Sequence, residues 1–145
     1  MNVIFLDFNG VLDTHEIFDV IDVGNLERLR KIVMETDSKV VVSSSLKNTY
    51  YFTGHHCRLF KYLVNALESV GIEVIGFTPK GENREVEIIK YLREHPEIDN
   101  YCILDDDYDM KSLNDHLVKI PNQMSKECKG LEDKYVDLAI KILKP

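Results

Sequence analysis

Short apolar runs alternate along this chain with longer segments in which apolar residues recur every three or four positions. A continuous apolar run that stops at polar residues is typical of a strand buried on both faces. Such runs predict strands at residues 3–6, 40–42, 72–77, 101–104 and, more briefly, 116–120. Strands that alternate with helices in this way indicate βαβ units and a parallel sheet.

The segments between these strands have the spacing of amphipathic helices. Their apolar residues are Leu26, Leu29 and Val33; Leu59, Phe60, Leu63, Val64 and Leu67; Val86, Ile89 and Leu92; and Leu131, Tyr135, Leu138 and Ile142. Asn25 and Asn83 stand where N-caps are expected, and Gly71 stands where a helix end favours a left-handed residue. Right-handed crossovers put helices on both faces of the sheet. We therefore expect one domain over residues 1–145, a Rossmann-like three-layer α/β sandwich with about five parallel strands.

Three predicted strands end in polar clusters, namely Asp7-Phe8-Asn9-Gly10, Ser43-Ser44-Ser45 and Asp105-Asp106-Asp107. Ligands of such sheets bind beyond the carboxyl ends of the strands, so neighbouring strands would bring these clusters together. Carboxylates from two strand ends repel each other unless a cation lies between them, and hard oxygen ligands suit Mg²⁺. We therefore expect a Mg²⁺ site formed by Asp7, Asp105 and Asp106, with Asp109 as a further candidate ligand.

The same strand ends offer groups that suit a phosphate. Hydroxyls of Ser43 and Ser44 can bind phosphate oxygens, and Lys80 or Arg84 can face the phosphate from the start of the following helix. Asp7 could then attack phosphorus as a carboxylate nucleophile. Each piece alone has an ordinary explanation as a turn, cap or surface charge. Their order, each at a strand end, favours a phosphate site.

The chain resembles the haloacid dehalogenase-like (HAD) superfamily of phosphatases and phosphotransferases. The resemblance rests on FLDFNGVLD, VVVSSS, a basic residue before or at a helix, and CILDDDYDM. The spacing of VVSSSLKN, GFTPKGENREVEIIKYL and HLVKI is most similar to the HAD domain of bacterial Swiss-army-knife RNA-repair proteins. This resemblance implies a Mg²⁺-dependent phosphatase that works through an aspartyl-phosphate.

The resemblance also implies residue roles. Asp7 would be the nucleophile and a metal ligand, with the backbone carbonyl of Asn9, Asp105 and Asp106 completing the metal site. The expected phosphate-binding residues are Ser43, Ser44 and Gly10. Arg84 or Lys80 would stabilise the phosphoryl charge, and the EIIKYL context favours Arg84.

Position 9 departs from the family pattern, which has a second Asp there. The amide of Asn9 cannot shuttle a proton, and general acid–base help contributes about 10²–10⁴-fold to rates. Three interpretations stay open: an engineered substitution, a naturally slow enzyme, or a catalytically weak phosphate-binding or regulatory relative. A response-regulator receiver ranks below all three, because receivers carry their acceptor Asp after the third strand.

The intervals 13–39 and 46–79 are too short for a cap domain, so we expect an open site that admits nucleic-acid 5′ or 3′ phosphate ends. Tyr50, Tyr51 and Phe52 are candidates for stacking on a base or for anchoring a loop. The net charge of −7, from 18 Lys and Arg against 25 Asp and Glu, argues against broad duplex DNA binding. No apolar run approaches the ~20 residues of a membrane span. Three cysteines without a CxxC pair fit a reducing cytoplasm.

Overall fold

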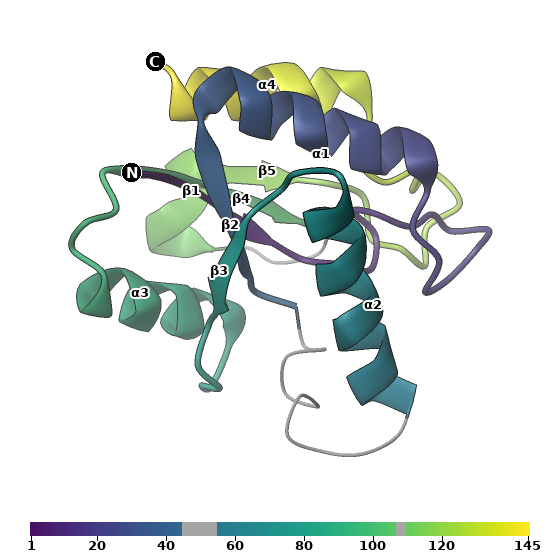
Figure 1. Ribbon diagram of the computed structural model, residues 1–145, viewed down its shortest axis with the longest axis horizontal. Helices are drawn as coiled ribbons and strands as arrows, with labels where there is room; N and C mark the ends of the chain where they lie inside the picture. The colour runs from purple at the N-terminus through teal and green to yellow at the C-terminus, as the bar shows by residue number, and fades with distance from the viewer. Residues whose placement is uncertain (45–54, 107–109) are drawn as a thin grey trace.

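The computed structural model describes residues 1–44, 55–106 and 110–145, with only the backbone described at 55–57. Within these residues, five parallel strands form one sheet in the order β3-β2-β1-β4-β5 (Figure 1). The strands are β1 (Asn2–Leu6), β2 (Ser38–Val42), β3 (Val74–Phe77), β4 (Asn100–Asp105) and β5 (Leu117–Lys119). The predicted parallel sheet is confirmed, and β1 lies at its centre.

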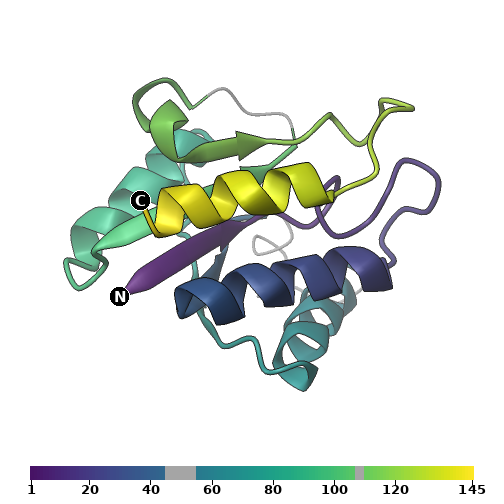
Figure 2. The ribbon, with the colours of Figure 1, turned by 90° about the horizontal axis from the view of Figure 1, so that it is seen from above.

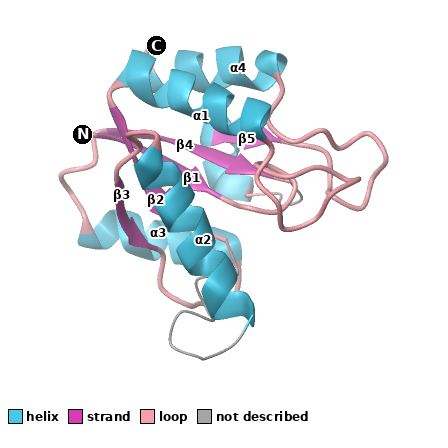
Figure 3. Cartoon of the chain, turned by 45° about the vertical axis from the view of Figure 1, so that its right-hand side comes forward, coloured by secondary structure: helices cyan, strands magenta, loops and turns pink. Residues whose placement is uncertain are grey.

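Helices cover both faces of the sheet, which confirms the three-layer α/β architecture. The helices α1 (Val23–Thr36), α2 (His55–Ser69) and α4 (Asp133–Leu143) pack on one face around Ile4 and Leu6. The helix α3 (Arg84–Glu94) and the 3₁₀ helix Lys111–His116 pack on the other face around Phe5. Figure 2 shows α1 and α4 side by side, and Figure 3 shows α3 across the sheet from them.

Local signals fix most helix ends where the sequence predicts them. The Asn83 side chain accepts a hydrogen bond from the backbone N–H of Val86 and caps α3, and Gly71 has a φ of 83° after α2. The expectation that Asn25 caps α1 is wrong. Asp22, three residues earlier, is the cap and accepts a hydrogen bond from the N–H of Asn25. Asn25 is instead buried in the first turn, where its amide donates to the carbonyl of Lys129.

The buried face of α3 agrees only in part with the predicted stripe, of which Ile89 and Leu92 pack against the core. The apolar stripe that begins at Val86 faces outward in part, since Val86 is 41% exposed. The buried residues of α3 are Arg84, Glu87, Ile88 and Tyr91. The first turn of α3 lies against the polar strand ends rather than the apolar sheet, so its buried positions are charged. This displacement brings Arg84 to the carboxyl edge of the sheet.

The connections between strands carry no additional domain in the described part of the chain. Residues 13–37 form a loop followed by α1, and the described residues between Ser44 and Pro79 form α2 and β3. Among the described residues, no cap domain lies over the carboxyl edge of the sheet. No helix in the described ranges is long and apolar enough to cross a bilayer.

Candidate active site

Four polar residues form a row across the carboxyl edge of the sheet. Leu6 pairs with Val42 and with Leu104, and Val42 pairs with Phe77. The residues one position further along these strands are therefore level with each other, and they are Thr78, Ser43, Asp7 and Asp105. Backbone hydrogen bonds continue the ladder into this row, from Asp7 N to Leu104 O, from Ser43 N to Leu6 O and from Thr78 N to Val42 O.

The side chains of this row point toward the face of the sheet that α3 covers. Phe5, Val41 and Ile103 belong to the core beneath α3, and their side chains lie two residues before Asp7, Ser43 and Asp105. Because side chains alternate between the faces of a strand, the members of the row point to the same side. The predicted convergence of the strand-end clusters therefore occurs on the face that α3 covers.

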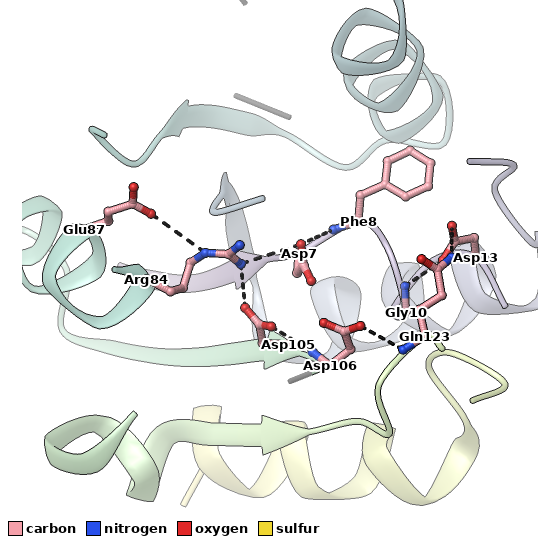
Figure 4. A network of polar contacts seen from close by, with 9 residues as sticks. All are labelled: Asp7, Phe8, Gly10, Asp13, Arg84, Glu87, Asp105, Asp106 and Gln123. Carbon is pink, nitrogen blue, oxygen red and sulfur yellow. Dashed lines mark hydrogen bonds and ion pairs between the residues drawn. The ribbon is translucent and has the colours of Figure 1, made fainter. Parts of the chain in front are cut away.

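Three carboxylates and one guanidinium meet at the centre of this row (Figure 4). Oxygen atoms of Asp7, Asp105 and Asp106 all lie within 4.8 Å of one another, and the three side chains are buried. The Nη1 of Arg84 lies 2.6 Å from Oδ2 of Asp105 and 3.6 Å from Oδ1 of Asp7. One positive charge thus faces three potential negative charges, and all four side chains are buried.

The backbone fixes the orientation of each carboxylate. Oδ1 of Asp7 accepts a hydrogen bond of 2.9 Å from the N–H of Phe8, and Oδ1 of Asp105 accepts one of 2.8 Å from the N–H of Asp106. Oδ2 of Asp106 accepts one of 3.0 Å from the N–H of Gln123. One oxygen of each carboxylate is thus held in place by a backbone N–H.

Electrostatics at this centre favour an added cation. Burial and the neighbouring carboxylates of Asp105 and Asp106 raise the pKa of Asp7 well above its ordinary value, although Arg84 opposes the rise. A divalent cation would remove this cost, because it would compensate both the lost hydration and the like-charge repulsion. The ligand atoms are hard oxygens held close together, which is the donor set that Mg²⁺ prefers. The residues present therefore fit a Mg²⁺ ion.

Gly10 makes room for the carboxylate of Asp106. It has a φ of +85°, and a Cβ built on it would lie 2.4 Å from Oδ2 of Asp106. Its N–H donates a hydrogen bond of 2.6 Å to Oδ1 of Asp13. The structure thus places Gly10 beside the predicted metal ligands, with its N–H engaged by Asp13.

Asp13, a buried residue that was not predicted from the sequence, is the centre of the hydrogen bonds in the loop after β1. Its carboxylate accepts hydrogen bonds from the Asn9 and Gln123 side chains and from the N–H groups of Gly10 and Asp19. Burial raises the pKa of Asp13, and these hydrogen bonds oppose the rise. The Nδ2 of Asn9 also donates to Oδ1 of Asp19. Position 9 is thereby tied to two carboxylates of its own loop.

The structure separates the two candidate cations. Arg84 is buried beside the carboxylates, whereas Lys80 is exposed. Glu87 is a further residue of this site and was not predicted from the sequence. It is buried, lies 3.8 Å from Nε of Arg84 and accepts a hydrogen bond from the N–H of Gly81. Its spacing of three residues from Arg84 on one helix was the available signal.

The remaining predicted residues have different placements. Ser43 and Ser44 are both buried directly after β2, and Ser43 belongs to the row described above. The predicted contributions of Asp109 to metal binding and of residues 50–52 to base stacking lie outside the described residues.

Comparisons with known proteins add one finding. Residues 3–132 match the family described as the HAD domain in Swiss Army Knife RNA repair proteins. No curated protein and no solved structure gives a significant match to the chain.

Proposed function

The chain belongs to this family of HAD domains, and we propose that it is a Mg²⁺-dependent phosphatase that hydrolyses phosphomonoesters through an aspartyl-phosphate on Asp7. The observation that carries the proposal is the buried group of Asp7, Asp105 and Asp106 beside Arg84. The resemblance adds the backbone carbonyl of Asn9 as a further ligand. Bound by these groups, Mg²⁺ would supply positive charge to the phosphate oxygens and to the attacking carboxylate.

In the first step, a carboxylate oxygen of Asp7 attacks the phosphorus atom. A bond forms between this oxygen and phosphorus, and the bond from phosphorus to the ester oxygen breaks. The leaving oxygen departs with the electron pair and takes a proton from solvent. Arg84, whose Nη1 lies 3.6 Å from Oδ1 of Asp7, offers N–H donors and positive charge to the transferring group. The hydroxyl of Ser43 would bind a phosphate oxygen from the neighbouring strand end.

In the second step, water attacks the phosphorus of the aspartyl-phosphate. The bond to the Asp7 oxygen breaks, inorganic phosphate leaves and the carboxylate is restored. A general base normally accelerates this step, but the amide of Asn9 accepts no proton at physiological pH. We expect turnover to be slower by about 10²–10⁴-fold than with an Asp at this position.

The alternative function is a phosphate-binding or regulatory protein with little turnover. The hydrogen bonds from Asn9 to Asp13 and Asp19 favour this alternative, because they use the amide as a structural tie. The two functions share one binding site and differ only in whether phosphate is released.

The absence of a cap over the described residues suits phosphate groups at the ends of large substrates. The family description refers to RNA repair, which favours 5′ or 3′ phosphate ends of nucleic acids as the substrate class. Because the net charge of the protein is −7, a nucleic-acid substrate would be bound through only a few of its phosphates. Arg84, Ser43 and the metal would bind the terminal one.

A phosphate-release assay tests the proposal. The substrates are an aryl phosphate and oligonucleotides with a 5′ or 3′ phosphate, each incubated with and without Mg²⁺. We expect Mg²⁺-dependent release by the wild-type chain, faster release by Asn9→Asp, and none by Asp7→Asn. If the wild type and Asn9→Asp both bind phosphate but neither releases it from the substrates, the alternative function is favoured. If the folded protein neither binds phosphate nor releases it from a substrate, both functions are overturned.

A further inference from the structure

We propose that the hydroxyl of Thr78 donates a hydrogen bond to a phosphate oxygen of the bound ligand, which extends the phosphate site from β1 and β2 onto β3. This inference rests on the proposed function and assigns a residue to its substrate-binding site. It concerns the residue directly after β3, to which neither the strand-end clusters nor the resemblance assigned a role.

The first observation is the position of Thr78. It follows Phe77 at the end of β3, and its N–H donates a hydrogen bond of 3.0 Å to the carbonyl of Val42. This bond places Thr78 beside Ser43, in the same row as Asp7 and Asp105.

The second observation is the face to which Thr78 points. A Cβ built on Gly76 would lie 2.9 Å from the hydroxyl oxygen of Tyr91 on α3. Thr78 stands two residues after Gly76, so its side chain lies on the same face of β3. That face also carries Arg84, which begins α3. Thr78 therefore points to the side of the sheet on which the carboxylates and the guanidinium lie.

The third observation is a buried hydroxyl without a partner. Thr78 is 1% exposed, and its Oγ1 has no hydrogen-bond partner within the described part of the chain. A buried hydroxyl of this kind is unfavourable in the free protein, and native structures rarely retain one without a reason. A bound ligand that accepts a hydrogen bond would remove this cost.

The chemistry of the neighbours identifies the ligand class. A hydroxyl is a neutral donor that adapts its direction, and phosphate oxygens are strong acceptors. Ser43 offers a second hydroxyl on the adjacent strand, and Arg84 offers a fixed positive charge. A phosphate group, with several acceptor oxygens, matches this set of donors from three elements.

The test replaces Thr78 by two residues that separate the hydroxyl from the methyl group. Thr78→Val keeps the shape and removes the hydroxyl, whereas Thr78→Ser keeps the hydroxyl and removes the methyl. Inorganic phosphate is titrated by calorimetry into the 145-residue chain of each variant and of the wild type in the presence of Mg²⁺. Thermal unfolding without phosphate is measured in parallel.

We expect Thr78→Val to bind phosphate more weakly by about tenfold to a hundredfold, the range for a hydrogen bond to a charged group. Thr78→Ser should retain the affinity. The unfolding midpoint of free Thr78→Val should equal or exceed that of the wild type, because an unpaired hydroxyl has been removed. A purely structural hydroxyl would give the opposite result.

Three outcomes overturn this inference while leaving the proposed function standing, and a fourth overturns both. Unchanged phosphate affinity in Thr78→Val would show that the hydroxyl does not meet the ligand. A lower unfolding midpoint, or failure to fold, would show that it has a structural partner. Loss of affinity in Thr78→Ser as well would assign the effect to the methyl group. If the wild type itself binds no phosphate, the proposed function fails together with this inference.

Discussion

Asn9 donates a hydrogen bond of 2.8 Å from Nδ2 to Oδ2 of Asp13. The same nitrogen lies 2.9 Å from Oδ1 of Asp19, so one amide serves two carboxylates. A carboxylate at position 9 would repel the carboxylates of Asp13 and Asp19 and would donate no hydrogen bond to them. The surroundings of position 9 therefore suit an amide, and this favours Asn9 as a fitted component of the loop over a foreign substitution.

The first prediction concerns Asn9→Asp, which we expect to trade stability for turnover. At pH 8 the variant should lose about 1–3 kcal/mol of unfolding free energy, the usual cost of depriving buried polar groups of their partner. Like charge would raise the pKa of the new carboxyl in the folded state above its unfolded value. The loss should therefore shrink as pH falls through that raised pKa. Urea unfolding at pH 5 and pH 8 measures this difference.

The control for this variant is Asn9→Asp combined with Asp19→Asn. It returns a donor to the loop and removes one negative charge, so we expect part of the stability at pH 8 to return. If Asn9→Asp is as stable as the wild type at pH 8, the two hydrogen bonds of Asn9 do not stabilise the loop.

The sequence was sufficient to predict the sheet and the central part of the site. Apolar runs that stop at Asp7 and Asp105 predict two buried strands, and the parallel topology then brings their ends together. Ser43 follows from the same rule. These predictions succeed because strand patterning and sheet topology are determined by burial, which the hydrophobic pattern records directly.

Other features depend on tertiary contacts that leave a weak trace in sequence. Asp22 and Asn25 are both good N-caps three residues apart, and packing of Asn25 against Lys129 decides between them. Arg84 and Glu87 are buried because they face strand ends, so the apolar periodicity of α3, which places Ile89 and Leu92 against the core, does not predict these two charged positions. Thr78 is one polar residue between Phe77 and Pro79, and nothing local distinguishes it from a turn residue.

The second prediction is that Asp7→Asn abolishes turnover and stabilises the metal-free protein. The pKa of Asp7 is raised in the folded state by burial and by Asp105. Between the unfolded and folded pKa values the folded state binds more protons, so stability falls as pH rises through that window. The amide removes this cost at neutral pH. Thermal unfolding in a chelator should show a higher midpoint for Asp7→Asn.

A matched control for this prediction is Asp137→Asn, since Asp137 is exposed on α4. It should leave the midpoint unchanged. Added Mg²⁺ should raise the midpoint of the wild type and have little effect on Asp7→Asn, because a ligand stabilises only the state that binds it. A lower midpoint for Asp7→Asn in chelator would refute the electrostatic account of the site.

The third prediction separates Arg84 from Lys80. Arg84→Lys keeps a positive charge but loses the planar guanidinium that reaches both Asp105 and Asp7. We expect kcat/KM for phosphomonoesters to fall by about 10²-fold, as for removal of one donor to a developing negative charge. Lys80→Ala should remain close to the wild type, because Lys80 is exposed. The reverse ranking in steady-state assays would assign the phosphoryl-stabilising role to Lys80.

The last prediction compares two glycines with the same backbone conformation. Gly10 and Gly71 have φ values of 85° and 83°, so alanine at either position costs about 1–2 kcal/mol of left-handed strain. Their surroundings differ. The new Cβ would lie 2.4 Å from Oδ2 of Asp106 at position 10, but 3.7 Å from the terminal methyl of Met34 at position 71. Only Gly10→Ala therefore has to displace a predicted metal ligand.

Both variants should lower the unfolding midpoint in chelator, and Gly71→Ala measures the contribution of backbone strain alone. The stabilisation that added Mg²⁺ gives to the wild type should survive in Gly71→Ala and be lost in Gly10→Ala. Displacing Asp106 also breaks its hydrogen bond from the N–H of Gln123. The backbone fixes the position of the Cβ of Ala, so the variant cannot avoid this contact by rotating a side chain. Equal Mg²⁺-dependent shifts in the two variants would show that Asp106 is not required for metal binding, and that Asp7 and Asp105 suffice.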